Sequence, residues 1–144
     1  MQHAAFLGLQ DMGFNMKQYR YYTKIEDINS IAQEIAKNKT VKAVYLFGSY
    51  AKEKPHILSD IDICIITNGD KEDTVNFPVT DNLDVSFFHR LPLMIQYRVF
   101  KEGKPLVVKD KEYIDNLKIM TLKKYLDLKP FINRFIWEKL KCTI

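Results

Sequence analysis

Three short stretches of β-branched and aromatic residues constrain the fold of this chain most strongly. They cover residues 41–47, 60–67 and 83–89, and residues that favour turns, such as Gly, Asn, Asp and Pro, lie between them. Stretches of this length and composition are typical of strands buried in a sheet. With 144 residues, the chain is long enough for one domain with a core and too short for two ordinary ones. We therefore expect one sheet to organise the domain.

Patterns typical of helices flank these strands. Residues 24–38 carry apolar residues at intervals of three and four, which indicates an amphipathic helix, and Thr23 with Glu26 has the spacing of a capping box. Downstream, Pro92 can open a helix because proline is tolerated in a first helical turn. Beyond that point the sequence predicts a helix, a short edge strand and two helices broken at Pro130, over residues 92–102, 105–108, 113–128 and 131–141.

Together these elements predict an α+β domain of the α/β type, in which a mixed β-sheet is flanked by helices. The chain has no internal repeat and no Gly/Ser-rich linker that would divide it. We expect residues 1–22 to form a poorly ordered N-terminal extension, residues 23–110 to form the core, and residues 111–144 to form a helical segment packed on that core.

The composition excludes several classes of protein. Hydrophobic residues make up 47% and charged residues 28% of the chain, which is typical of globular proteins, and no apolar run approaches the roughly 20 residues that cross a bilayer. The N-terminus lacks the basic start of a secretory signal, so we expect a cytoplasmic protein with no membrane partner. Cys64 and Cys142 are too few for a disulfide framework or a metal cluster, and Cys64 lies in an apolar run typical of a buried thiol.

The net charge of +4 is concentrated near the C-terminus. Residues 1–100 carry 11 basic and 12 acidic residues, a net of −1, whereas residues 101–144 carry 11 and 6, a net of +5. A basic segment of this kind can meet nucleic acid, nucleotide phosphates or an acidic protein surface, or it can be a solvated helix face. The aromatic residues Phe131, Phe135 and Trp137 could anchor a partner or close the core.

A glycine–serine pair directly follows the first predicted strand. Gly48 has no Cβ, so the backbone can turn sharply there and approach a ligand closely. Ser49 offers a hydroxyl and a backbone N–H at the start of what could be a short helix, and a helix N-terminus suits a phosphate group. Taken alone, Ser49 can equally be a helix cap.

Aspartates open the second and third predicted strands. Asp60 and Asp62 are two residues apart at the start of one strand, so their carboxylates face the same side. Asp84 is the second residue of the next strand, and if the two strands are neighbours the three carboxylates converge. Adjacent carboxylates repel each other unless a cation lies between them, and their oxygens suit Mg²⁺. Three such groups form a ligand set for two metal ions about 4 Å apart.

The combination of these motifs is more specific than any one of them. Gly48-Ser49, ten intervening residues, Asp60-x-Asp62 and a third aspartate on a later strand resemble the signature of the DNA polymerase β-like nucleotidyltransferase superfamily. In size and layout the chain is similar to the minimal nucleotidyltransferases, the MntA-like antitoxin group that pairs with HEPN-domain proteins. The resemblance covers residues 25–108 and implies a nucleotidyltransferase fold.

The resemblance also implies roles for individual residues. Asp60, Asp62 and Asp84 would be the catalytic carboxylates and would bind two Mg²⁺ ions. The last of them would also assist deprotonation of the acceptor hydroxyl.

The same resemblance implies that ATP is the nucleotide donor. Gly48, Ser49 and Lys52 would bind its phosphates. Many relatives carry Arg-Gly where this sequence has Lys52-Glu53, so the positive charge is kept while the glycine is lost.

The implied activity is transfer of AMP from ATP to a protein hydroxyl, a tyrosine of a partner HEPN-type toxin. The chain would then act as the antitoxin of a toxin–antitoxin system, with the toxin rather than nucleic acid as its partner and an oligomer formed with that partner as one form of the assembly. Two alternatives stay open at this point. The acceptor could be a small molecule or an RNA end, or the chain could be a non-catalytic antitoxin that neutralises its partner by binding alone.

Overall fold

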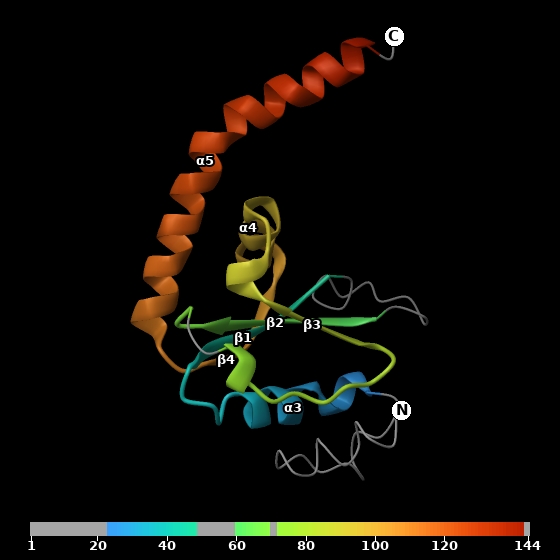
Figure 1. Ribbon diagram of the computed structural model, residues 1–144, viewed down its shortest axis with the longest axis vertical. Helices are drawn as coiled ribbons and strands as arrows, with labels where there is room; N and C mark the ends of the chain where they lie inside the picture. The colour runs from blue at the N-terminus through green and yellow to red at the C-terminus, as the bar shows by residue number, and fades with distance from the viewer. Residues whose placement is uncertain (1–22, 49–59, 70–71, 143–144) are drawn as a thin grey trace.

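The computed structural model describes residues 23–48, 60–69 and 72–142, and Figure 1 shows their arrangement. The expected N-terminal extension, together with Ser49 and Lys52, lies outside the described residues. The described elements are η1 (Ile25–Asp27), α3 (Ile28–Ile35), β1 (Val41–Phe47), β2 (Ile61–Thr67), η2 (Glu72–Thr74), β3 (Leu83–Phe87), η3 (Phe88–Arg90), α4 (Leu93–Glu102), β4 (Lys104–Val108) and α5 (Lys111–Cys142).

The four strands form one mixed sheet in the order β3-β2-β1-β4. β1 pairs antiparallel with both β2 and β4, whereas β2 pairs parallel with β3. Because β2 and β3 run the same way and β1 runs the opposite way, the end of β1 and the starts of β2 and β3 lie at one edge of the sheet. The predicted α+β architecture with a mixed sheet is confirmed.

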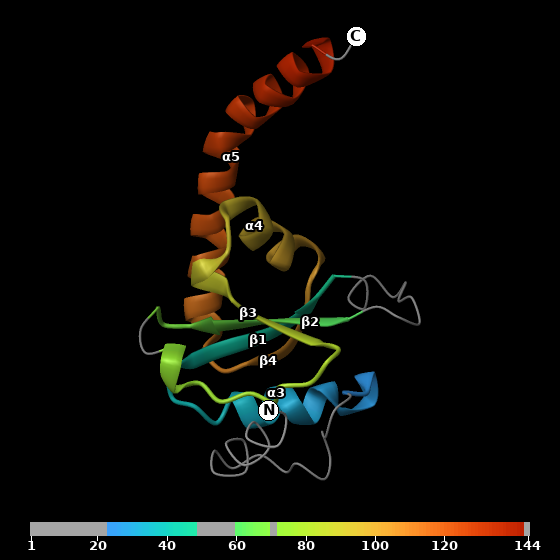
Figure 2. The ribbon, with the colours of Figure 1, turned by 45° about the vertical axis from the view of Figure 1, so that its right-hand side comes forward.

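Helices cover both faces of this sheet, as Figures 1 and 2 show: α3 lies against one face, and α4 and the first half of α5 lie against the other. Alternate residues of each strand point to opposite faces, which divides the core into two clusters. The α3 side contains Ile28, Ile31, Ala32, Ile35, Val41, Val44, Leu46, Ile61, Ile63, Ile65 and Val75. The side of α4 and α5 contains Ala43, Tyr45, Cys64, Ile66, Phe88, Val99 and Ile114.

The predicted capping box before α3 is wrong. The chain enters the helix through the 3-10 turn η1, whose N-cap is Lys24 and makes no side-chain capping bond. Thr23 is instead buried and tied to the segment before β3: its N–H donates to Asn82 Oδ1 (2.7 Å), and its carbonyl accepts from Asn82 Nδ2 (2.6 Å). The Thr23 hydroxyl lies 2.7 Å from the Thr80 hydroxyl. Tertiary bonds therefore replace the local cap.

The predicted helix break at Pro130 is also wrong, because α5 runs through Pro130 without interruption. A proline inside a helix removes one backbone N–H donor and bends the helix, but the φ angle that its ring imposes is compatible with a helix. Figures 1 and 2 show α5 bending at mid-length and its second half extending beyond the rest of the molecule. Asp110 caps the start of α5, where its Oδ1 accepts from the Tyr113 N–H at 3.0 Å.

Within the described part of the chain, no helix combines the length and apolar character that a membrane crossing requires.

Candidate active site

The candidate site lies at the sheet edge where β1 ends and where β2 and β3 begin. In the strand register, Asp62 pairs with Phe47 of β1 on one side and with Asp84 of β3 on the other. Asp62 is therefore central, with the Gly48 turn and the Asp84 carboxylate as its neighbours. β2 and β3 are adjacent, which is the condition on which the sequence predicts that the carboxylates converge, and the two aspartates occupy matching positions of a parallel pair.

Burial and nearby negative charge raise the pKa of the Asp62 carboxyl. Asp62 is half-buried, and burial is the largest of the effects that raise its pKa from 3.8 to about 6. The charge of Asp84 raises this pKa next, followed by the charge of Asp60 and by a hydrogen bond that the Asp62 and Asp84 carboxyls share. Near pH 6 the pair therefore binds a proton that an isolated carboxylate would have lost.

Asp60 stands apart from this pair. It is exposed, immediately before β2, and it acts on Asp62 through its charge. Among the residues that the structure describes, no three His, Cys, Asp or Glu side chains are grouped closely enough to hold a metal ion. The structure thus brings two of the three predicted carboxylates into contact and leaves the third at the rim.

Gly48 makes room for the Asp62 carboxylate. Its φ angle of +77° lies in the region that favours glycine, and a Cβ built at this position would collide with Asp62 Oδ2. The sequence predicts that Gly48 approaches a ligand closely, but it does not reveal the contact between Gly48 and Asp62. Only the β1–β2 register shows that these two residues are neighbours.

Asp62 and Asp84 supply the kind of oxygen ligand that a divalent cation such as Mg²⁺ prefers. Burial, the charges of Asp84 and Asp60 and a shared hydrogen bond raise the pKa of Asp62, and a bound cation would offset the repulsion between these charges. Carboxylate oxygens are hard ligands, which suit Mg²⁺ better than softer metals.

Two other titratable residues lie away from this chemistry. Burial, and then the charge of Glu72, raises the pKa of Cys64 to about 12, so its thiol stays protonated and fills the core as expected from the sequence. The Nε2 atom of His89 lies 3.0 Å from the carbonyl of Thr67, the last residue of β2, whereas Asp62 is at the start of that strand. His89 therefore belongs to the opposite end of the sheet.

The family described as Polymerase beta, Nucleotidyltransferase matches residues 29–112, a span that takes in the whole sheet. The match covers more than half of the chain, so this protein belongs to that nucleotidyltransferase family, and the superfamily predicted from the motifs is confirmed. At the level of sequence, no curated protein matches the chain.

Solved structures with a similar fold come from toxin–antitoxin complexes. A chain from a toxin–antitoxin complex with AMP-PNP superimposes with a TM-score of 0.65 at 18% identity, over 80% of this chain and 97% of that one. A chain of an MntA–HepT toxin–antitoxin complex gives 0.60 at 17%, over 81% and 99%. A third, from the tri-AMPylated Shewanella oneidensis HEPN toxin in complex with its MNT antitoxin, gives 0.54 at 15%, over 97% and 99%. At these identities the likeness establishes the fold.

Proposed function

We propose that this chain is a Mg²⁺-dependent nucleotidyltransferase that moves AMP from ATP onto a tyrosine hydroxyl of a partner HEPN-type toxin and so acts as its antitoxin. The observation that carries this proposal is the pairing of Asp62 with Asp84 beside the Gly48 turn, in a chain of the nucleotidyltransferase family. The toxin–antitoxin complexes with a similar fold support the choice of partner, and the neighbour with AMP-PNP supports an adenine nucleotide.

In this proposal Asp60, Asp62 and Asp84 hold the Mg²⁺ ions. When bound, these ions polarise the α-phosphate of ATP and offset the charge that develops on the leaving pyrophosphate. Asp84 takes the proton of the acceptor hydroxyl, since it is exposed at the start of β3 and open to an incoming group. The hydroxyl oxygen then forms a bond to the α-phosphorus while the bond from that phosphorus to pyrophosphate breaks.

The turn after β1 has a separate task. Because Gly48 has no side chain, its backbone and the Asp62 carboxylate lie close together, and we assign the triphosphate to this turn, with Ser49 and Lys52 as its further ligands. A backbone that lacks side-chain bulk can approach phosphate oxygens closely and offer N–H groups to them. Binding and metal ligation are thus divided between β1 and the β2–β3 pair.

The test uses purified protein, a candidate HEPN-domain partner, Mg²⁺ and ATP labelled either on the α- or on the γ-phosphate. Transfer of AMP predicts that the α-label appears on the partner and that the γ-label leaves with pyrophosphate. Label from the γ-position on the partner would instead mean phosphorylation and would contradict the proposal. Label on a small molecule or an RNA end, with the partner unlabelled, would favour the alternative acceptors.

A paired variant separates catalysis from neutralisation by binding alone. Asp60→Ala with Asp62→Ala removes two proposed metal ligands, and Asp115→Ala, an exposed carboxylate on α5, serves as the matched control. We expect the first variant to lose labelling and neutralisation together, while the control keeps both. Full neutralisation by the double variant would mean that the chain acts by binding only.

A further inference from the structure

The second half of α5 exposes an apolar face that its first half buries. Ile114, Thr121, Leu128 and Phe135 recur every seven residues and therefore lie along one side of the helix. Ile114 and Thr121 are 1% and 4% exposed against the sheet and α4, whereas Leu128 and Phe135 are 39% and 61% exposed. The same face thus continues past the end of the domain, where no other described helix or strand covers it (Figure 1), and the Lys139 ammonium lies 5.6 Å from the centroid of the Phe135 ring.

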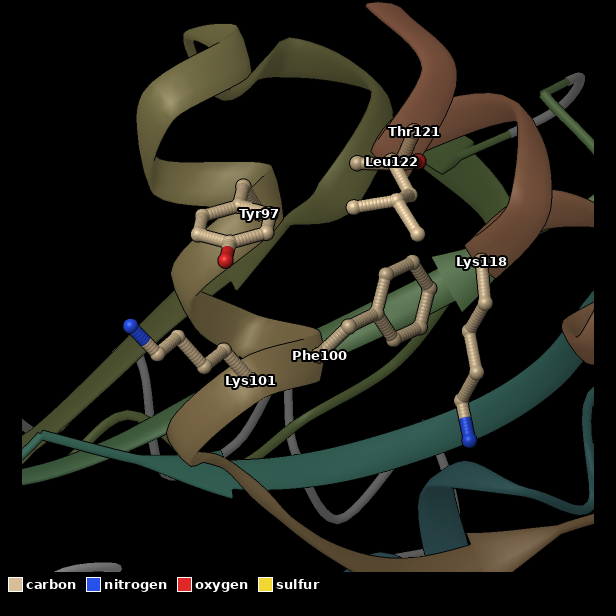
Figure 3. Close-up of a pocket in the computed structure, with 6 residues that line it drawn as sticks. All are labelled: Tyr97, Phe100, Lys101, Lys118, Thr121 and Leu122. Carbon is tan, nitrogen blue, oxygen red and sulfur yellow. The ribbon is translucent and has the colours of Figure 1, made fainter. Parts of the chain in front are cut away.

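A cavity lies where the buried part of this face gives way to the exposed part. It has a volume of about 250 Å³ and is lined by Tyr97, Phe100 and Lys101 of α4 and by Lys118, Thr121 and Leu122 of α5. Figure 3 shows the ring of Phe100 and the side chain of Leu122 facing each other across it. A cavity with aromatic and aliphatic walls can receive one apolar anchor from a partner, the arrangement found at the centres of protein interfaces.

This cavity is on the same side of the sheet as the carboxylate pair. Phe100 packs edge-on against Tyr45, with ring centroids 5.6 Å apart. Tyr45 is two residues before Phe47, the partner of Asp62 in the sheet register, which amounts to about 7 Å along the strand. A protein seated in the cavity would therefore lie within reach of the carboxylates.

The charge around the exposed face indicates what kind of protein fits. Between residues 123 and 139 the helix carries five cationic side chains, Lys123, Lys124, Lys129, Arg134 and Lys139, against two acidic ones, Asp127 and Glu138. The net charge of +3 would repel a second copy of this helix, so the sequence disfavours pairing between two copies. It favours an apolar surface with an acidic rim.

We infer that the cavity and the distal face of α5, here Leu128, Ile132 and Phe135, form one docking surface for an apolar segment of the acceptor protein that is rimmed by acidic residues. This inference rests on the proposed function, because it takes the acceptor to be a protein. The docked segment lies along α5, places one apolar side chain in the cavity and holds its chain on the catalytic side of the sheet. Docking and chemistry are then carried by different residues of this chain.

The test measures binding of the HEPN-domain protein to the full chain by calorimetry in the absence of ATP. Phe135→Glu and Trp137→Glu form a matched pair, because both side chains are aromatic and highly exposed (61% and 68%), while two residues turn the helix by about 200°. We expect Phe135→Glu to weaken binding at least about 30-fold and Trp137→Glu to change it less than about threefold. Melting curves check that both variants stay folded.

Each outcome decides a different point. Unchanged affinity in Phe135→Glu, equal losses in both variants, or no binding by the unmodified chain would overturn the docking surface. If the affinity for the HEPN-domain protein does not fall as the salt concentration rises, the claim that the partner surface has an acidic rim is wrong. Labelling of the acceptor from α-labelled ATP is scored separately: binding through α5 without labelling refutes the proposed function alone, and labelling with full affinity in Phe135→Glu refutes the docking surface alone.

Discussion

Replacing Asp62 by asparagine tests the electrostatics of the site directly. The folded protein raises the pKa of Asp62 from 3.8 to about 6, so the ionised carboxylate destabilises the fold above pH 6 and costs nothing below pH 4. At 1.36 kcal/mol per unit, the full shift corresponds to about 3 kcal/mol. Because the side chain is only half-buried, solvent screening reduces this to about 1–2 kcal/mol. Asp62→Asn should therefore stabilise the metal-free protein at pH 7.5 and stabilise it only about one third as much at pH 4.5.

The assay is thermal unfolding with EDTA at both pH values. For a chain of this length, the expected gain at pH 7.5 is about 3–6 °C in Tm. Asp115→Asn, on the exposed surface of α5, controls for the loss of a carboxylate elsewhere. Added Mg²⁺ should raise the Tm of the unmodified protein and not that of Asp62→Asn. An equal gain at both pH values, or no gain at pH 7.5, would refute the claim that burial and the neighbouring carboxylates raise this pKa.

Three further predictions concern the site and its support. Gly48→Ala should lower the free energy of unfolding in urea by about 1–2 kcal/mol more than Gly69→Ala. Both glycines have positive φ angles (+77° and +95°), but only the Gly48 Cβ would meet Asp62. Equal losses in the two variants would contradict this steric argument. Below about pH 6, the apparent Mg²⁺ affinity should fall about tenfold per pH unit, because Asp62 must release its proton before it binds the ion. An affinity that calorimetry finds constant from pH 7 to 5 would exclude Asp62 as a ligand. Asn82→Ala should lower the free energy of unfolding by about 2–3 kcal/mol, because the backbone N–H and carbonyl of buried Thr23 both lose their hydrogen-bond partner. A loss below about 0.5 kcal/mol would show that water replaces the Asn82 side chain.

The strands and the carboxylate pair were accessible from sequence because each depends on local pattern. β-Branched runs between turn residues located β1, β2 and β3, and the placement of Asp62 and Asp84 near the strand starts predicted their approach on the condition that the two strands are neighbours. Once the parallel pairing forms, equal positions in neighbouring strands must meet. The nucleotidyltransferase superfamily was predicted from the spacing of Gly48-Ser49, Asp60-x-Asp62 and Asp84 along the sequence.

Features that depend on tertiary contacts were not accessible in this way. The hydroxyl of Thr23 has a local capping geometry available to it, but the buried contact with Thr80 and Asn82, nearly sixty residues away, prevails. Pro130 is a helix breaker by local rule, yet α5 continues through it as a single bent helix. The need for glycine at position 48 comes from a carboxylate on another strand, which only the register of the sheet reveals.

The stacking of Tyr97 on Tyr125, with ring centroids 3.8 Å apart, is another tertiary contact that the sequence does not reveal. It joins α4 to α5 beside the cavity, and neither tyrosine carries any sequence signal of the pairing. The sequence predicted helices over residues 113–128 and 131–141, but it did not distinguish the part of α5 that packs on the domain from the part that extends beyond it.

The most direct test of the central claim is intact-mass spectrometry of the HEPN-domain partner after incubation with this chain, ATP and Mg²⁺. If the carboxylates at the β2–β3 edge transfer AMP, the unmodified chain adds AMP units to a tyrosine of the partner. Asp62→Asn and Asp84→Asn then add none although they still bind the partner. A partner that is neutralised without any gain in mass, or one that Asp62→Asn modifies as fast as the unmodified chain does, would contradict the account.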